Sequence, residues 1–202
     1  MDADAPAMLD IAFEIEGDAL ARDYQHGLAA ALEAALPWLA DEPGAGVHRL
    51  NLAAGAQTLL SRRTRLTLRV PRARAAAVEA LSGRALALEA GSLRLGRSHR
   101  RELLPHGTLY AHLVAADGDA DERAFLASVE RELEALGVPC RTICGRRAAI
   151  EAGSVQGYSL MLDGLGKASA LRVLEAGLGP HRRLGCGLFV AHRSAAAVGA
   201  PP

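Results

Sequence analysis

The sequence predicts an α+β protein with two successive units, each in the order strand, helix, strand, strand, helix, strand. Short segments that alternate between apolar and polar residues indicate half-buried strands, and apolar stripes at helical spacing lie between them. The same order of segments occurs twice along the 202 residues, a length that suits one large or two small domains. Half of the residues are hydrophobic, which is ample for a core.

The first unit begins with an expected strand over residues 8–16. Leu9, Ile11, Phe13 and Ile15 share one face of this strand. A helix follows, for which Asp23 is the expected N-cap. Its apolar stripe consists of Leu28, Leu32, Leu36 and Leu39. The remaining expected elements are strands at 47–52 and 63–70, a helix at 72–81 and a strand pair around 90–92.

The second unit repeats the plan from residue 108. A strand at 108–115 precedes a helix with Leu126, Val129, Leu133 and Leu136 at intervals of three and four, stopped by Gly137 and Pro139. A hairpin at 139–150 and 155–162, a helix at 167–176 and a strand at 187–192 follow. This order is ferredoxin-like (RRM-like) in both halves. We therefore expect tandem domains at 1–104 and 105–202, with a disordered tail from about Ser194.

The charge balance restricts how the protein can bind nucleic acid. The formal net charge is zero, which excludes a uniformly basic surface, so a nucleic-acid site has to be a local patch. All the cations except Lys167 are arginines, which suit bidentate phosphate binding. The alanine-rich composition also indicates a GC-rich genome, which favours arginine without any functional reason. The arginine excess alone therefore decides nothing.

Cysteine usage and hydropathy predict the compartment. Cys140, Cys144 and Cys186 are too few, and odd in number, for a disulfide framework. The spacing of the first two is not that of a standard zinc-ligand pair, which favours buried free thiols over a zinc site. No apolar run reaches membrane-spanning length, and the N-terminus is acidic rather than signal-like. We expect a cytoplasmic protein that does not bind membranes.

A glycine-rich loop at 177–187 is the most informative segment. The pairs Gly177/Gly179 and Gly185/Gly187 flank a basic tip, which consists of His181, Arg182 and Arg183. Glycine permits positive φ and close approach to a ligand, and the basic tip suits phosphate. Because the loop follows a helix and precedes a strand, its order is the reverse of a dinucleotide fingerprint. From the loop alone, nucleic-acid contact and a solvated turn with exposed arginines both stay open.

Arginines also line one expected strand. Arg63, Arg65 and Arg69 share a face of the 63–70 segment, and Arg62 precedes them. Along a strand, side chains two residues apart are separated by about 7 Å. Such a row either protects a solvated edge or follows a phosphate backbone. Aromatic residues are few, and no strand carries the paired exposed aromatics of a sheet that reads single strands. Basic edges without them point to structured RNA, read by shape and phosphates.

Several segments in this order resemble the CRISPR-associated endoribonucleases of the Cas-six family, which process precursor CRISPR RNA. The resemblance covers most of the chain, and its most specific part is the glycine-rich loop running into Phe189-Val-Ala-His-Arg-Ser194. The other segments are Asp23-Tyr24, Leu36-Pro-Trp-Leu39, Leu104-Pro-His-Gly-Thr-Leu-Tyr110, Ile143-Cys-Gly-Arg-Arg147 and Tyr158-Ser-Leu-Met-Leu162.

The resemblance implies a metal-independent nuclease that needs no cofactor and cuts once at the base of a repeat hairpin. The substrate's own 2′-hydroxyl attacks the adjacent phosphate, which leaves a 2′,3′-cyclic phosphate. A family histidine at the start of the first helix matches His26, which lies about 200° around the helix from Leu28 and so off the core face. Tyr24 is a candidate for positioning the 2′-hydroxyl. Other subunits of a CRISPR effector complex are possible partners.

Other residues and functions remain open at this level. His48, His99, His106, His112, His181 and His192 compete with His26 as the catalytic histidine. The candidate phosphate contacts are Arg62, Arg63, Arg65, Arg97, Arg100, Arg146, Arg147, Arg182 and Arg183. One alternative is a hairpin-binding subunit that does not cut. Another is a ferredoxin-like small-ligand or regulatory protein.

Overall fold

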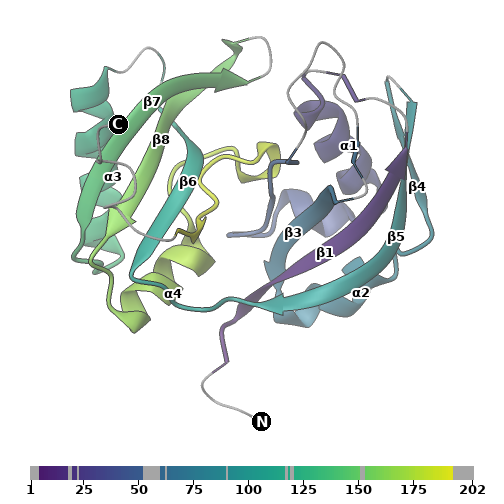
Figure 1. Cartoon of the computed structure of the whole chain (residues 1–202), viewed down its shortest axis with the longest axis horizontal. Helices are drawn as coiled ribbons and strands as arrows, with labels where there is room; N and C mark the ends of the chain where they lie inside the picture. Colours follow the sequence, from purple (N-terminus) through teal and green to yellow (C-terminus); the bar gives the residue numbers. More distant parts are fainter. Residues whose placement is uncertain are drawn as a thin grey trace. The chain divides into compact units, whose positions relative to one another are not determined.

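A computed structural model describes residues 5–17, 20–21, 23–51, 60–61, 63–89, 91–116, 118, 121–150 and 153–192 (Figure 1). The chain divides into two compact units. The first holds Met1–Glu102 together with Arg183–Gly185 from the glycine-rich loop, and the second holds Leu103–Arg182 and Cys186–Pro202. The boundary expected at 104/105 lies two residues from the observed division, but the assignment of Arg183–Gly185 to the first unit was not anticipated. Arg62 and the expected tail from Ser194 lie outside the described residues.

The first unit contains a five-stranded antiparallel sheet in the order β2-β3-β1-β5-β4. Its elements are β1 (Met8–Gly17), α1 (Gln25–Ala35), β2 (Gly46–Val47), β3 (Arg65–Pro71), α2 (Ala75–Glu79), β4 (Ala85–Leu88) and β5 (Gly91–Glu102). Short 3₁₀ turns at Pro37–Ala40 and Arg72–Arg74 extend the two helices. The order β2-β3-β1-β5 is the ferredoxin-like one, and β4 adds a hairpin strand at its edge.

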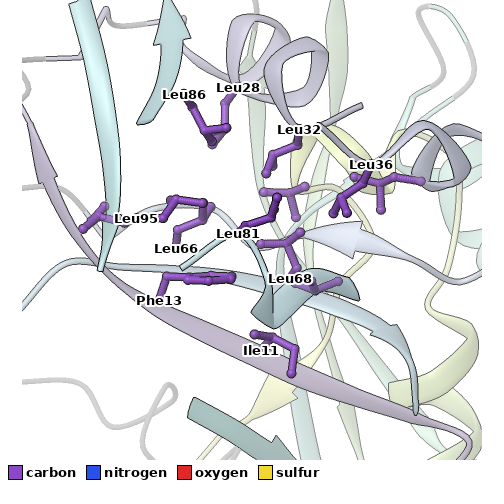
Figure 2. Packing of buried hydrophobic residues seen from close by; sticks show 14 of the residues in the cluster. Ile11, Phe13, Leu28, Leu32, Leu36, Leu66, Leu68, Leu81, Leu86 and Leu95 are labelled. Carbon is purple, nitrogen blue, oxygen red and sulfur yellow. The ribbon is translucent and has the colours of Figure 1, made fainter. Parts of the chain in front are cut away.

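The core of this unit forms where the predicted apolar stripes meet. Ile11 and Phe13 of β1 point from the sheet toward leucines of α1, among them Leu28 and Leu32 (Figure 2). All four are at most 2 % exposed. Burying a side chain of this size stabilises the fold by about 1.5–3 kcal/mol relative to leaving it in water. The strand and helix periods read from the sequence therefore define this core.

A β-bulge in β5 changes which residues face the helices. Ile15 pairs with Leu95, but Phe13 pairs with Ser98, so one extra residue lies between the two pairs. Leu95 and Ser98 are both on the helix side, since Leu95 is in the core and the Ser98 hydroxyl bonds Ser82 after α2. Without the bulge, Arg97 would follow Leu95 onto the helix side. With it, the alternation places Arg97, His99 and Arg101 on the opposite, open face.

The second unit contains a four-stranded antiparallel sheet in the order β7-β8-β6-β9, which is again ferredoxin-like. Its elements are β6 (Thr108–Ala115), α3 (Glu122–Ala135), β7 (Arg141–Ile150), β8 (Val155–Asp163), α4 (Lys167–Ala176) and β9 (Val190–Ala191). The Asp121 carboxylate caps α3 by accepting a hydrogen bond from the Ala124 N–H at 2.8 Å. Phe125 of α3 packs on Tyr158 of β8, with ring centroids 4.8 Å apart.

The boundaries of some elements differ from the predictions. Tyr24, not Asp23, is the N-cap of α1, and it makes no side-chain capping bond. On α3 the buried residues are Phe125, Val129 and Leu133, whereas Leu126 and Leu136 of the predicted stripe are half-buried. β2 and β9 have only two residues each. A short apolar run in the sequence predicts that a segment is buried. The number of its residues that pair as a strand depends on the neighbouring strand.

A buried ion pair joins β1 to β3 on the face opposite the first core. Arg69 donates two hydrogen bonds to Asp10, Nε to Oδ1 at 2.8 Å and Nη2 to Oδ2 at 3.0 Å. His48 Nε2 lies 3.4 Å from Asp10 Oδ1, close enough for a charge contact. The Arg69 side chain is only 2 % exposed. Burial acts to raise the pKa of the Asp10 carboxyl, but His48 and Arg69 more than offset it and hold that pKa well below its ordinary value.

The first prediction concerns this ion pair. Asp10→Asn should lower the free energy of unfolding at pH 7 by about 3 kcal/mol or more, because it leaves Arg69 buried without a counter-charge. Since the carboxyl has a lower pKa folded than unfolded, its contribution is complete above about pH 4 and declines as pH falls below that. Urea unfolding at pH 7 and pH 3 should therefore show a difference between wild type and variant that is about 1 kcal/mol smaller at pH 3. Exposed Asp41→Asn is the matched control, and an Asp10→Asn effect independent of pH would contradict the assignment.

The second prediction concerns close backbone packing in the second sheet. A Cβ added to Gly157 of β8 would lie 2.0 Å from the Val114 carbonyl oxygen. We expect Gly157→Ala to cost about 2–3 kcal/mol in urea unfolding, because the two strands must separate. Gly107→Ala is the control, since its nearest neighbour is the Leu165 carbonyl oxygen at 3.9 Å, and it should stay within about 0.5 kcal/mol of wild type. Equal costs for the two variants would show that the sheet accommodates the methyl group.

Candidate functional site

The start of α1 presents one of the two candidate catalytic residues to solvent. His26 lies in the first turn of the helix and is exposed. Tyr24 is 7 % exposed, and its hydroxyl accepts a hydrogen bond from the Leu50 N–H at 2.8 Å. Burial raises the pKa of the Tyr24 hydroxyl, against smaller opposing effects of that bond and of Arg49. Tyr24 is therefore a neutral phenol directed into the core, and His26 is the group that a ligand can reach.

The glycine-rich loop is a folded element held by its own backbone. The Leu178 N–H donates to the Gly187 carbonyl at 3.2 Å, and the Gly187 N–H donates to the Leu113 carbonyl of β6 at 2.7 Å. A Cβ at Gly187 would lie 1.8 Å from the Leu178 carbonyl oxygen, and the residue has a φ of +65°. Glycine is thus required here by both space and backbone conformation. The loop closes on itself before any ligand binds.

An acidic side chain of the second unit engages the loop. The Glu132 carboxylate of α3 accepts a hydrogen bond from the Gly179 N–H at 2.8 Å. Arg182 lies against Gly177, where a Cβ would come within 2.9 Å of its Nε. Burial lowers the pKa of the Arg182 guanidinium, and the charge of Glu132 opposes this. Arg182 is consequently packed into the loop rather than directed away from it.

The tip of the loop is attached to α1. Arg183 Nη1 donates to the Glu33 carboxylate, and a Cβ at Gly185 would lie 3.3 Å from backbone atoms of both Val47 and Arg49. Glu33 and His26 are seven residues apart, two helical turns, and so lie on one face of α1 at about 10 Å separation. Sequence reasoning missed Glu33, because nothing in the local pattern of α1 relates it to a loop 150 positions away. The first unit thus carries a histidine and a tethered arginine on the same helical face.

The loop tip also contains a residue in an uncommon backbone conformation. His181 is exposed and has a φ of +65°, the only positive value for a residue other than glycine in the part of the chain that the structure describes. Its carbonyl accepts a bond from the Cys186 N–H at 3.3 Å. The tight turn of the loop fixes this conformation, which projects the imidazole outward.

The arginines of β3 are partly used within their own sheet. Arg65 donates to the Thr64 carbonyl at 3.0 Å and lies 3.8 Å from the Glu14 carboxylate, and Arg69 is held by Asp10. Arg63 is exposed beside the strand. The row expected from the sequence thus exists on one face of β3, but β1 supplies carboxylates opposite two of its members.

The basic residues of β5 and β7 lie in different surroundings. Arg100 donates to both oxygens of Glu79 at 2.6 Å on the helix side of the first sheet, whereas Arg97 is exposed on the open face. In the second unit Arg146 is exposed, and Arg147 donates to the Gln156 side-chain oxygen at 2.8 Å. Arg97 and Arg146 therefore have more freedom to bind an external phosphate than Arg100 has.

The remaining histidines are scattered. His48 contacts Asp10, His99 is exposed on β5, and the His106 Nδ1 lies 3.0 Å from the Thr108 carbonyl oxygen. His112 and His192 flank Tyr110 in the second unit. His48 and His99 belong to the first unit, as His26 does, and His106 belongs to the second.

The three thiols are free, and burial differs among them. Cys186 is buried, whereas Cys140 and Cys144 are only half-buried. Burial raises the pKa of Cys186 to about 12 and, with a smaller effect of Glu122, that of Cys144 to about 11. Within the described ranges no three His, Cys, Asp or Glu side chains gather in a metal-binding arrangement. No helix in those ranges is long and apolar enough to span a bilayer.

The third prediction tests the tether between Glu33 and Arg183. Glu33→Gln should accelerate hydrogen exchange of the backbone amides at 182–187 several-fold, because the tip loses its ionic attachment to α1. The free energy of unfolding should change by less than about 1 kcal/mol, since both side chains are partly exposed. Glu16→Gln is the control, because Glu16 is exposed near the end of β1. Unchanged exchange at 182–187 in the Glu33 variant would show that the backbone alone holds the tip.

The comparisons with known proteins cover nearly the whole chain. The family model described as "Cas6 Crispr" matches residues 9–194. A protein of Myxococcus xanthus named CRISPR-associated endonuclease Cas6 is 35 % identical over 193 residues, which are 94 % of this chain and 84 % of that protein.

Solved structures agree at the level of the fold. A Cas6-related protein of Pyrococcus furiosus superimposes with a TM-score of 0.61 at 13 % identity, over 91 % of this chain and 98 % of the other. A structure titled CRISPR associated protein Cas6 gives 0.65 at 10 % identity, over 92 % and 100 %. The architecture is thus the tandem ferredoxin-like fold of these structures. By the match of its family model and its identity to the Myxococcus protein, the chain belongs to the Cas6 family of CRISPR proteins.

Proposed function

We propose that this protein is an endoribonuclease that binds the hairpin of a CRISPR repeat and cuts precursor CRISPR RNA into guide RNA. The observation that carries the proposal is the exposed His26 on the same face of α1 as the tethered Arg183. A proton-transfer group and a cation on one accessible surface suit phosphodiester chemistry. Named relatives support it: the Myxococcus protein is called an endonuclease, and one structural relative is titled a Cas6 product complex.

The proposed reaction uses the RNA as its own nucleophile and needs no metal. The 2′-oxygen forms a bond to the adjacent phosphorus while the bond from phosphorus to the 5′-oxygen breaks. The 2′-hydroxyl proton goes to a base, and the departing 5′-oxygen takes a proton from an acid. The products are a 2′,3′-cyclic phosphate and a 5′-hydroxyl. His26 serves as the base or the acid, roles in which histidine is the most frequent side chain.

In this proposal Tyr24 does not contact the RNA directly. Its phenol is buried, and its hydroxyl accepts a hydrogen bond from the Leu50 N–H. This burial supports a positioning role, in which Tyr24 fixes the start of α1 and hence the place of His26. The exposed Arg63, Arg97, Arg146 and His181 are the proposed phosphate contacts, joined by Arg183 at the loop tip. Gly177, Gly179, Gly185 and Gly187 act through the loop backbone.

One alternative has a specific observation in its favour. Tyr24, the second candidate catalytic residue, is buried, and its hydroxyl accepts a hydrogen bond from the Leu50 N–H, which does not favour direct contact with RNA. A subunit that holds the hairpin within a CRISPR effector complex without cutting would need only the basic residues. Nothing in the site favours a small-ligand or regulatory function.

The fourth prediction separates these functions. In EDTA, the wild-type protein should cut a labelled repeat hairpin once and leave a cyclic-phosphate end. His26→Ala should lower the single-turnover rate by about 10²–10⁴-fold, because general acid–base catalysis is worth that much, with hairpin affinity within about 2-fold of wild type. Exposed His106→Ala is the matched control and should cut normally.

The other outcomes are equally informative. Cutting that survives in His26→Ala would retain the nuclease and discard His26. Binding without cutting in the wild-type protein would favour the hairpin-holding subunit. An absolute requirement for a divalent cation would overturn the metal-independent mechanism.

A further inference from the structure

A row of apolar side chains crosses the open face of the second sheet. The strand register aligns four residues, one from each strand: Ile143 of β7, Met161 of β8, Tyr110 of β6 and Val190 of β9. Cross-strand partners point to the same face of a sheet. Tyr110 is one of the two inner members of this row, and the other, Met161, is only 5 % exposed.

This face is the one that the helices of the unit leave uncovered. Leu109 and Ala111, the neighbours of Tyr110 along β6, pair with Leu162 and Leu160 of β8, and all four are at most 1 % exposed. They belong to the helix side, where Phe125 of α3 packs on the same strand β8. Because side chains alternate along a strand, Tyr110 projects to the other side.

Two imidazoles flank Tyr110 on the open face. The His112 ring stands nearly perpendicular to that of Tyr110, with centroids 5.1 Å apart and an interplanar angle of 77°. The His192 ring lies 5.7 Å away at 52°. His112 is exposed, Tyr110 and His192 are half-buried, and Val190 is 38 % exposed. Three rings and an exposed valine thus form one accessible aromatic surface.

Polar residues bound this surface on one side. Arg141 of β7 is exposed and aligns with Asp163 of β8, whose carboxylate accepts a hydrogen bond from the Thr108 hydroxyl at 2.6 Å. Asp163 is therefore engaged within the sheet, and Arg141 is an exposed cation on the same face, two strands from β6. An aromatic surface with an arginine on the same side of the sheet matches the face and the phosphate of an unpaired nucleotide.

We propose that Tyr110, with His112 and His192, is a stacking platform for a base in single-stranded RNA next to the repeat hairpin. The inference rests on the proposed RNA substrate but assigns it a second contact in the second unit, separate from His26. Bases within a stem are already stacked, whereas a base in a flanking single strand has a free face for the rings. The sequence obscured this platform because two of its three rings are histidines that lie far apart in sequence, His112 on β6 and His192 directly after β9.

The experiment compares two RNAs and graded variants. One RNA is the bare repeat hairpin, and the other carries a single-stranded flank with 2-aminopurine, whose fluorescence reports stacking. Tyr110→Leu should bind the flanked hairpin about 10-fold or more weakly than wild type, and the bare hairpin equally well. Tyr110→Phe should retain binding, since the ring stays, and His112→Ala should show an intermediate loss. The salt dependence of binding should be unchanged, because no phosphate contact is lost.

Controls keep the platform distinguishable from the proposed nuclease function. Exposed Leu104→Ala is the matched control outside the platform, and thermal melting checks that Tyr110→Leu is folded. Equal weakening for both RNAs, or no weakening, would overturn the platform. Loss of cutting with unchanged binding would also overturn the platform, and it would indicate that the rings take part in catalysis. If the wild-type protein binds neither the bare nor the flanked hairpin, the proposed function fails. The platform would still be supported if the wild-type protein binds the single-stranded flank alone and Tyr110→Leu abolishes that binding.

Discussion

The glycine-rich loop depends on one steric constraint, the contact between the backbones at its two ends. Gly187 approaches Leu178 so closely that only a hydrogen atom fits, and its N–H simultaneously reaches β6. This closure brings the strand that follows the loop against Tyr110 of β6. A side chain at that position would disturb both the loop and β9. The loop is therefore preorganised, and its ordering cost is met during folding rather than on binding.

Internal ion pairing decides which basic residues remain available for a ligand. The protein has as many acidic as basic residues, and the structure pairs several of them specifically, Asp10 with Arg69 and Glu79 with Arg100. Pairs of this kind fix strands and helices, and they reduce the local positive potential. Arg97 and Arg146, by contrast, are exposed. A neutral chain can in this way present local basic surfaces without an overall attraction to polyanions.

The sequence was sufficient for the fold but only partly for the site. Alternation in β1 and the leucine stripe of α1 report burial directly, so the order of elements and the position of His26 off the core face followed from periodicity. The Glu33–Arg183 contact and the Tyr110 platform did not, because both join residues far apart in sequence. The bulge in β5 was also hidden, since one extra residue in a strand leaves no compositional mark. Tyr24 lies two residues before His26 in sequence, but only the structure shows that its hydroxyl is directed to Leu50.

The assignment of Arg183–Gly185 to the first unit has a consequence for how the protein can be divided. Most domains are continuous stretches of chain that fold independently. Here a fragment ending near residue 102 would lack three of its own residues, and the complementary fragment would carry them without their partners. Genetic fusion, circular permutation or the exchange of halves between relatives would have to respect this discontinuity. The two halves of the chain therefore cannot be separated by a single cut, although each has its own sheet and core.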